Sequence, residues 1–267
     1  MATNGGMGAG GVFEVFEPWI RLDLVRRYQA LGALVCAYAQ GSLVERLARE
    51  GDIDVVLVWR DDLPVRPERP PSGLADPEPQ PLVFDHEPSF VVDRFWHAGQ
   101  QFDVKHIVRA EVDSWVEAVE AGEGRSGYPM PVVGIHGLVN GVVLADSGGY
   151  AAGIRERMRH VPAPFRRAAW LSGEAAEAFL QELRRCVDRG DYLLFHSLAV
   201  EAIRAAFIGW FAARDLYWPH EKRLSERLAL AGYPDLAELE RAVWSKDGLA
   251  ARLEAIDALL SRLRDDS

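Results

Sequence analysis

Two carboxylates, Asp52 and Asp54, stand two residues apart where a run of apolar residues, 55–59, begins. Side chains of a β-strand alternate between its faces, so both carboxylates point the same way while Ile53 points to the opposite face. Like charges held this close repel each other, and a divalent cation such as magnesium relieves that repulsion. The pattern therefore predicts a metal site at the start of a strand.

A glycine and a serine, Gly41 and Ser42, separate an apolar run, 33–39, from a polar segment, 43–51, whose spacing predicts a short helix. Gly41 lets the backbone approach a phosphate closely. Ser42, at the start of the expected helix, adds a hydroxyl to the free N–H groups there. The order of strand, glycine turn, helix and strand pairs a phosphate cradle with a metal clamp, as a nucleoside triphosphate with magnesium requires.

Gly-Ser, a short helix and Asp-x-Asp in an apolar strand resemble the signature of the DNA polymerase β-like nucleotidyltransferase superfamily. The similarity is greatest to its small antibiotic-modifying type, which acts on aminoglycosides or lincosamides and has a helical C-terminal domain. The resemblance implies a third carboxylate on a neighbouring strand, and Asp103 in the apolar-Asp-apolar segment 102–104 fits that role. These motifs span roughly a quarter of the chain.

The resemblance implies a reaction and its cofactors. Two Mg²⁺ ions held by Asp52, Asp54 and Asp103 would promote transfer of a nucleoside monophosphate, commonly AMP from ATP, to a hydroxyl of a small acceptor, with release of pyrophosphate. Asp103, or an acidic residue that the sequence does not identify, would take the hydroxyl proton. The acceptor and the preferred base stay open.

Two lysines are further candidates for binding the nucleotide. Lys105 shares the strand face of Asp103, and either an ion pair with the carboxylates or a contact to a phosphate fits it. His106 points to the other face, which favours a packing or surface role. The resemblance implies that Lys222, in a Pro-x-x-Lys segment beginning at Pro219, reaches the triphosphate from a helix start, with Arg223 as a weaker candidate; the alternative is that Lys222 is a solvated charge.

A purely structural interpretation of the acidic pair is also possible. Asp52 would then cap a turn after Gly51, and Asp54 would be the exposed position of an edge strand. The run 55–58 argues against this interpretation, because it is typical of a strand buried on both faces, where an unpaired carboxylate is costly.

Composition limits the class of protein. The 267 residues are 49% hydrophobic, which supports a packed core, and the net charge of −10 argues against a protein that grips nucleic acid through its phosphates. Two cysteines, Cys36 and Cys186, provide neither a disulfide framework nor metal-ligand spacing, so a reduced cytoplasm is the expected compartment. No apolar run is expected to span a membrane, and residues 1–11 are expected to be a disordered leader.

The predicted fold is a two-domain α+β protein, with a mixed-sheet catalytic domain over 12–160 and an all-α helical bundle over 161–267. A helix near Pro18 should cover one face of the sheet, and 60–81, with seven prolines, should be irregular. Prolines 162 and 164 mark the domain boundary. The remaining strands are expected over 88–96 and 101–108, joined by a turn at 97–100, and over 142–146, where Asp146 is expected to be a strand-end or turn residue rather than a fourth metal ligand. Helices are expected over 109–121, 150–160, 172–189, 191–214, 220–231, 234–244 and 249–263, with an N-cap at Ser172 and a helix stop at Gly232.

Other functions share parts of this pattern. A protein-modifying nucleotidyltransferase of toxin–antitoxin type would carry the same motifs and differ in its acceptor, and a non-catalytic module would bind nucleotide without turnover. A tRNA-modifying enzyme is disfavoured by the acidic balance. Arg189 and His196 have the Arg-x6-His spacing of a helical ribonuclease superfamily, but the polar residue that usually supports that arginine is missing. Trp210, Tyr217 and Trp218 are expected in the core first and in an acceptor pocket second.

Overall fold

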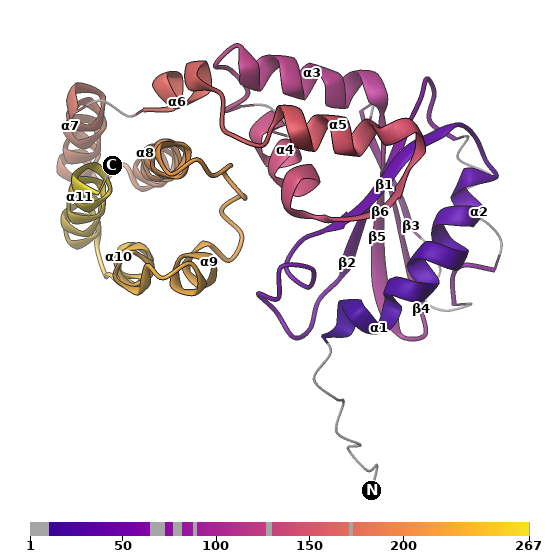
Figure 1. Ribbon diagram of the computed structural model, residues 1–267. Coiled ribbons are helices and arrows are strands. Elements are labelled where there is room, and N and C mark those ends of the chain that lie inside the picture. The colour runs from indigo at the N-terminus through magenta and orange to yellow at the C-terminus, as the bar shows by residue number, and fades with distance from the viewer. Residues whose placement is uncertain are drawn as a thin grey trace, which may run out of the picture. The chain divides into compact units, whose positions relative to one another are not determined.

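The computed structural model describes residues 11–64, 73–76, 82–87, 90–126, 130–170 and 173–266. Its elements follow one another along the chain as Figure 1 shows. The predictions for residues 1–10, for 65–72 and 77–81, and for an N-cap at Ser172 lie outside the described residues. The chain divides into two compact units: 1–116 with 134–159, and 117–133 with 160–267.

The first unit contains a six-stranded mixed sheet, and the predicted α+β class is confirmed. Strand β2 pairs with β5 in parallel, and the other neighbours are antiparallel. The order across the sheet is β3-β4-β5-β2-β1-β6. The strands are β1 (Leu34–Gln40), β2 (Ile53–Trp59), β3 (Leu82–Glu87), β4 (Phe90–His97), β5 (Gln100–Val108) and β6 (Val142–Asp146).

The hairpin β4–β5 was predicted, and its turn lies where expected. Ala98 and Gly99 connect the strands with φ of 50° and 78°, the left-handed conformation that a two-residue hairpin turn requires. Strand β3, which pairs with β4 at the edge of the sheet, was not predicted from the sequence. The hairpin brings β5 back beside β2, so the parallel pair is adjacent in space although β3 and β4 intervene in sequence.

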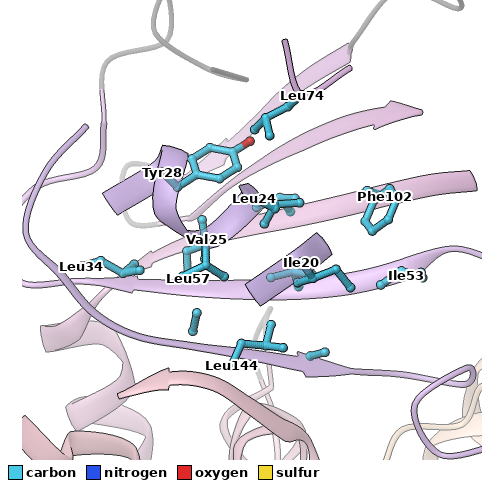
Figure 2. Close-up of a cluster of buried hydrophobic side chains, with 14 of the residues drawn as sticks. Ile20, Leu24, Val25, Tyr28, Leu34, Ile53, Leu57, Leu74, Phe102 and Leu144 are labelled. Atoms are coloured by element: carbon cyan, nitrogen blue, oxygen red, sulfur yellow. The ribbon is translucent and has the colours of Figure 1, made fainter. Parts of the chain in front are cut away.

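A helical segment covers one face of the sheet, as predicted. It consists of α1 (Val12–Trp19), a π-helical turn η1 (Ile20–Leu24) and α2 (Val25–Gln29), so it begins before Pro18 rather than near it. Ile20, Leu24 and Val25 project onto Ile53, Leu57 and Phe102 of the central strands (Figure 2). Full burial of such a side chain contributes about 1.5–3 kcal/mol each, so this layer fixes the helix on the sheet.

A polar network is enclosed in the same layer. The Tyr28 hydroxyl donates to Asp93 at 2.8 Å, and His106 Nε2 lies 3.0 Å from the same carboxylate. The Trp59 indole N–H donates to His106 Nδ1 at 3.2 Å, so Nε2 carries the ring proton and donates to Asp93. Asp93 and His106 are fully buried. The predicted packing role of His106 is therefore confirmed.

The opposite face of the sheet carries the functional candidates and a second set of helices. These are α3 (Arg109–Glu120), α4 (Pro131–Asn140) and α5 (Tyr150–Arg157), which follows a short 3-10 turn, η3 (Ser147–Gly149). Helix α5 packs against β1 and β6 (Figure 1). Asp146, at the end of β6, accepts hydrogen bonds from the backbone N–H groups of Ala151 and Ala152, which confirms it as a strand-end residue rather than a fourth metal ligand. Helix α4 was not predicted.

The second unit is helical. Its helices are α6 (Ala163–Ala169), α7 (Gly173–Arg189), α8 (Tyr192–Ala213), α9 (Leu224–Leu230), α10 (Pro234–Ser245) and α11 (Leu249–Asp265). Gly232, with φ of 89°, follows the end of α9 as predicted. Trp210, Tyr217 and Trp218 are buried and belong to the core, in line with the first expectation for them.

Helix α8 bears on the expectation that no apolar run spans a membrane. Its 22 residues, with a mean hydropathy of 1.3, are long and apolar enough to cross a membrane by length and composition. In the structure α8 packs against α6, α7 and α11, and eleven of its residues are buried. An all-round apolar helix in this position is the core helix of a bundle.

Candidate metal and nucleotide site

The structure brings Asp52, Asp54 and Asp103 together. One carboxylate oxygen from each of the three lies within 4.8 Å of the others. Asp54 and Asp103 occupy paired positions of the parallel strands β2 and β5, and Asp52 directly precedes β2. Asp103 is buried, and the other two are half-buried. Such a group of hard oxygen donors could bind a divalent metal ion.

Two cations are paired with these carboxylates. Lys105 Nζ lies 2.7 Å from Asp54 Oδ1. Arg94 donates from Nε and Nη2 to the two oxygens of Asp103, at 2.7 and 2.6 Å. Gln101 Nε2 adds a third hydrogen bond to Asp103 at 3.2 Å. Lys105 thus forms the ion pair that was one of its two expected roles.

Arg94 was missed by the sequence analysis. It lies on β4 directly opposite Asp103, because the β4–β5 hairpin pairs these two residues. The signal was present in the hairpin itself, since counting outward from the turn at Ala98 and Gly99 pairs Arg94 with Asp103. A bidentate guanidinium–carboxylate pair fixes both groups more firmly than a lysine would.

The pKa values reflect this arrangement. Burial raises the pKa of Asp54 above its ordinary value; the cation of Lys105 opposes that shift, while the charges of Asp52 and Asp103 add to it. The hydrogen bond to Asp103 raises the pKa of Arg94, so its guanidinium stays charged. An ionised Asp54 is therefore costly in the folded chain, and a bound cation would lower that cost.

Gly41 makes room for Asp54. It follows β1, where Gln40 pairs with Asp54, and its φ is +91°. A Cβ placed on Gly41 would lie 2.5 Å from Asp54 Oδ2, closer than real Cβ contacts. The glycine is therefore required by a carboxylate of the site as well as by its own backbone conformation.

The segment after Gly41 is not a helix, which corrects the sequence prediction for 43–51. The backbone forms turns: the Leu47 and Ala48 N–H groups both donate to Ser42 O, at 2.8 and 3.2 Å. Arg46 has φ of 58°, and a left-handed residue at that point ends any α-helical run. Ser42 is buried at the start of these turns rather than at a helix N-terminus.

This turn segment makes polar contacts with its surroundings. Arg46 Nη2 contacts Glu14 Oε1 at 2.9 Å, and His136 Nε2 lies 3.8 Å from Glu45 Oε2. Gln100 Nε2 donates to Gly51 O at 2.6 Å, just before Asp52. Side chains from α1, α4 and β5 therefore hold both ends of the segment that links Gly41 to the acidic pair.

Lys222 belongs to the second unit, in a stretch without helix. Helix α9 begins at Leu224, so Pro219 does not start a helix, which corrects that part of the prediction. His220 and Arg223 have φ of 94° and 57°, and the Lys222 N–H donates to His220 Nδ1 at 3.1 Å. Lys222 is exposed. Its role toward a nucleotide stays a prediction.

Of the Arg-x6-His pair, His196 makes a contact between helices. His196 Nε2 lies 3.1 Å from Arg252 Nη1 on α11, and Arg189 is exposed at the end of α7. Asp191 precedes α8, and its N–H donates to Cys186 O at 2.9 Å. These contacts connect α7, α8 and α11.

Comparison with known proteins gives a distant likeness. No protein-family model matches the chain, and no curated protein matches it. Among solved structures, the chain is similar to a nucleotidyltransferase-like protein from Exiguobacterium sibiricum 255-15. The two are 13% identical, the match covers 94% of this chain and 74% of that chain, and the TM-score is 0.44. The functional argument therefore rests on the geometry of the site.

Proposed function

We propose that this protein is a magnesium-dependent nucleotidyltransferase that moves a nucleoside monophosphate, AMP from ATP in its common form, to a hydroxyl of a small, antibiotic-like acceptor. One observation carries the proposal: carboxylate oxygens of Asp52, Asp54 and Asp103 gather within 4.8 Å, beside the glycine turn at Gly41. The resemblance of the sequence motifs to the polymerase β-like superfamily supplies the reaction class.

The donor set suits the proposed cofactor. All three candidate ligands are carboxylates, and oxygen donors favour magnesium, manganese or calcium over zinc or copper. When bound, two magnesium ions supply Lewis-acid chemistry that aligns the attacking hydroxyl with the α-phosphorus and neutralises the leaving pyrophosphate. Asp54 and Asp103, held on neighbouring strands, would fix the positions of the ligands.

Two cationic side chains beside the carboxylates have a role in this proposal. Lys105 and Arg94 keep the buried carboxylates in place by ion pairing, and they carry positive charge next to the expected triphosphate. Such charge stabilises a transition state in which the leaving phosphate oxygens become more negative. The turn at Gly41 and Ser42 would present backbone to the phosphates, and Asp103 is our candidate to accept the acceptor's proton.

The acceptor is proposed to be a small molecule on grounds of charge. With a net charge of −10 the chain repels long polyanions, whereas cationic or neutral hydroxyl compounds are not repelled. We place Lys222 of the second unit toward the triphosphate on the strength of the family resemblance. A protein acceptor, as in toxin–antitoxin pairs, would use the same site, and co-purification of a partner would identify it.

A second candidate is a nucleotide-binding module without catalysis. The bidentate pair between Arg94 and Asp103 favours it, because a carboxylate neutralised in this way is a weaker metal ligand and a weaker base. Such a module would bind nucleotide and never release pyrophosphate.

Turnover separates these functions. Purified protein is incubated with magnesium, each of the four nucleoside triphosphates and a panel of hydroxyl-rich small molecules, and pyrophosphate and nucleotidylated products are followed by mass spectrometry. The proposal predicts a product that disappears in Asp54→Asn and persists in Asp62→Asn, an exposed aspartate outside the group. Wild-type turnover in Asp54→Asn would refute the site.

The second unit is tested in the same assay. Lys222→Ala should lower catalytic efficiency by roughly tenfold to a thousandfold if its ammonium meets the triphosphate. Lys246→Ala, another exposed lysine of this unit, should not. Equal kinetics of the two variants would remove Lys222 from the nucleotide site and leave the acidic group untouched.

A further inference from the structure

A cavity lies at the other end of the sheet from the acidic group. In the β1–β2 pairing, Gln40 and Asp54 stand at one end, and Leu34 and Trp59 stand at the other. The cavity adjoins the latter end and has a volume of about 490 Å³. Five residues of extended strand, 55–59, separate Asp54 from Arg60, and the six steps along the chain span roughly 20 Å, so this is a separate place in the first unit.

The parallel strands deliver two arginines to this cavity. Strands β2 and β5 run side by side in register, with Trp59 paired to Val108 at their carboxyl ends. The next residues, Arg60 and Arg109, therefore leave the sheet together, and both line the cavity. Arg157, from the last turn of α5, contributes a third guanidinium.

The charge of the lining is positive. Among the described lining residues, three are arginines and one is acidic: Asp113 accepts from Arg109 Nε at 3.1 Å and from the Tyr150 hydroxyl at 2.8 Å. The Arg109 guanidinium lies 5.0 Å from the centre of the Tyr150 ring, so it is held from two sides. Arg60 is exposed and makes no ion pair with any other described residue. The chain as a whole has a net charge of −10, but the positive lining of this pocket would attract anions locally.

Glycines keep the floor of the cavity open. Gly148 and Gly149, between β6 and α5, have φ of 73° and 76°, and a Cβ at either, or at Gly153, would meet no atom within 4 Å. The N–H groups of Ala151 and Ala152 are already bonded to Asp146. Attraction for an anion therefore comes from the arginine side chains rather than from the end of α5.

We propose that this cavity is a second ligand site, which binds small molecules carrying two or more phosphate charges through Arg60, Arg109 and Arg157. Its volume lies within the range of about 300–1,000 Å³ that small-molecule sites occupy, and exceeds what a single inorganic ion needs. Guanidinium groups bind phosphate and carboxylate in the same forked geometry, so a polycarboxylate is the competing ligand of this chemistry.

The test uses full-length protein with EDTA, so that metal-dependent nucleotide binding does not contribute. Calorimetric titrations with fructose 1,6-bisphosphate, inorganic phosphate and citrate serve as probes. The bisphosphate should bind once per chain, more tightly than phosphate or citrate. Arg60→Ala should weaken it by roughly tenfold or more, the effect of losing one charged hydrogen-bonding partner, whereas Arg26→Ala, an exposed arginine outside the cavity, should not.

Charge reversal inside the cavity gives an independent arm. Gly153 is a helical position where a side chain has open space, so Gly153→Glu introduces a carboxylate without a clash, and Gly153→Gln introduces the same bulk without charge. Gly153→Glu should abolish bisphosphate binding while Gly153→Gln retains most of it. Absence of saturable binding to wild type, or equal affinities of the Arg60→Ala and Arg26→Ala variants, would overturn the site. Tighter binding of citrate would overturn the phosphate class.

Discussion

At the scale of single residues, the acidic group depends on what surrounds it. Three carboxylates within 4.8 Å would repel one another strongly. Ion pairs of Lys105 with Asp54 and of Arg94 with Asp103 offset part of that repulsion. A metal ion bound by these carboxylates would have to compete with the two cations for the same oxygen atoms. Removing one of them therefore has opposite consequences for the metal-free and the metal-loaded protein.

The variant Arg94→Gln should show this opposition. Without the guanidinium, Asp103 keeps a buried charge whose remaining hydrogen bond among the side chains described above comes from Gln101, and the metal-free protein should lose roughly 1–3 kcal/mol of unfolding free energy. Binding of Mn²⁺ should become tighter, because a competing cation is gone. Urea unfolding in EDTA and a Mn²⁺ titration followed by electron paramagnetic resonance measure the two effects. Arg94→Lys, which keeps the charge without the fork, should fall between; weaker Mn²⁺ binding in Arg94→Gln would contradict the argument.

Gly41 permits a second residue-level test. Gly41→Ala places a methyl group 2.5 Å from Asp54 Oδ2 and forces a left-handed alanine. The backbone alone should cost about 1–3 kcal/mol, and displacement of Asp54 should also reduce Mn²⁺ affinity. Gly148→Ala has a similar φ but open space around its Cβ, so it should show the stability loss and leave Mn²⁺ affinity unchanged. Equal Mn²⁺ affinities in the two variants would show that Gly41 does not shape the site.

The sequence identified Asp52 and Asp54 because strand alternation, a local rule, puts both on one face, whereas Asp103 was identified because the family resemblance implies a third carboxylate on a neighbouring strand. Arg94 escaped because its partner lies across a hairpin, and cross-strand register is known only once the turn is fixed. Even there, the turn was predicted at 97–100, so the pairing could have been counted. The proximity of Arg60 and Arg109 at the cavity could not be counted in this way, because it depends on the parallel register of β2 and β5.

At the scale of elements, most strands and the long helices were predictable, whereas strand β3, helix α4 and the short connection 43–51 were not. Segment 43–51 has helical spacing, but Arg46 adopts a left-handed backbone conformation that ends the helix. The sequence gives no sign of this, because the residue in that conformation is an arginine rather than a glycine. Helix α9 begins later than predicted for a related reason, since His220 and Arg223 both adopt positive φ. Propensity is a weak guide wherever side-chain contacts decide the backbone.

Asp215 lies at a junction between helices, and its carboxyl group has a shifted pKa. Located after α8 with φ of 61°, it accepts from the Val161 N–H at 2.7 Å and from His160 Nδ1 at 2.5 Å, and Arg166 lies 3.4 Å away. Burial acts to raise the pKa of Asp215, but the hydrogen bonds from His160 and Val161, together with nearby positive charge, outweigh it and lower the pKa below its ordinary value. The junction between α6 and α8 thus contains a carboxylate that prefers to be ionised.

A depressed pKa in the folded state stabilises the protein above the unfolded value of 3.8 and loses that contribution as pH falls through the folded value. Asp215→Asn, which tolerates positive φ, should therefore melt at a lower temperature than wild type at pH 7. The difference should shrink below pH 3.8. Melting curves by circular dichroism from pH 7 to pH 2 provide the measurement. Asp247→Asn, an exposed aspartate between α10 and α11, is the control; a gap between Asp215→Asn and wild type that persists at low pH would exclude charge as its cause.

At the scale of the whole molecule, the change from strands to helices along the chain was visible in the sequence. Which residues belong to the second unit was not visible. Residues 117–133 group with 160–267, although they precede β6 and α5 of the first unit. The reason is tertiary contact: Gly122 lies against Pro164, and Arg125 donates to Ala168 O. No local pattern reveals that a stretch of chain packs on residues far ahead of it.

Because residues 117–133 belong to the second unit, a fragment that contains them should be more stable than one that lacks them. A fragment of residues 117–267 retains the contacts of Gly122 and Arg125 with α6, whereas 161–267 lacks them. The longer fragment should therefore unfold cooperatively at a higher temperature. Thermal unfolding by circular dichroism and resistance to limited proteolysis would compare the two. If 161–267 alone were as stable, residues 117–133 would contribute nothing to that unit.

The two cysteines have a practical consequence for labelling. Cys36 in β1 and Cys186 in α7 are free and buried. Burial raises the pKa of the Cys36 thiol to about 12 and also raises that of Cys186, so both remain protonated at neutral pH and react slowly with electrophiles. A single cysteine introduced on the surface, for example Lys246→Cys, would be modified selectively by a maleimide. The natural chain is thus already a background for attaching fluorophores or spin labels, with no need to remove its own thiols.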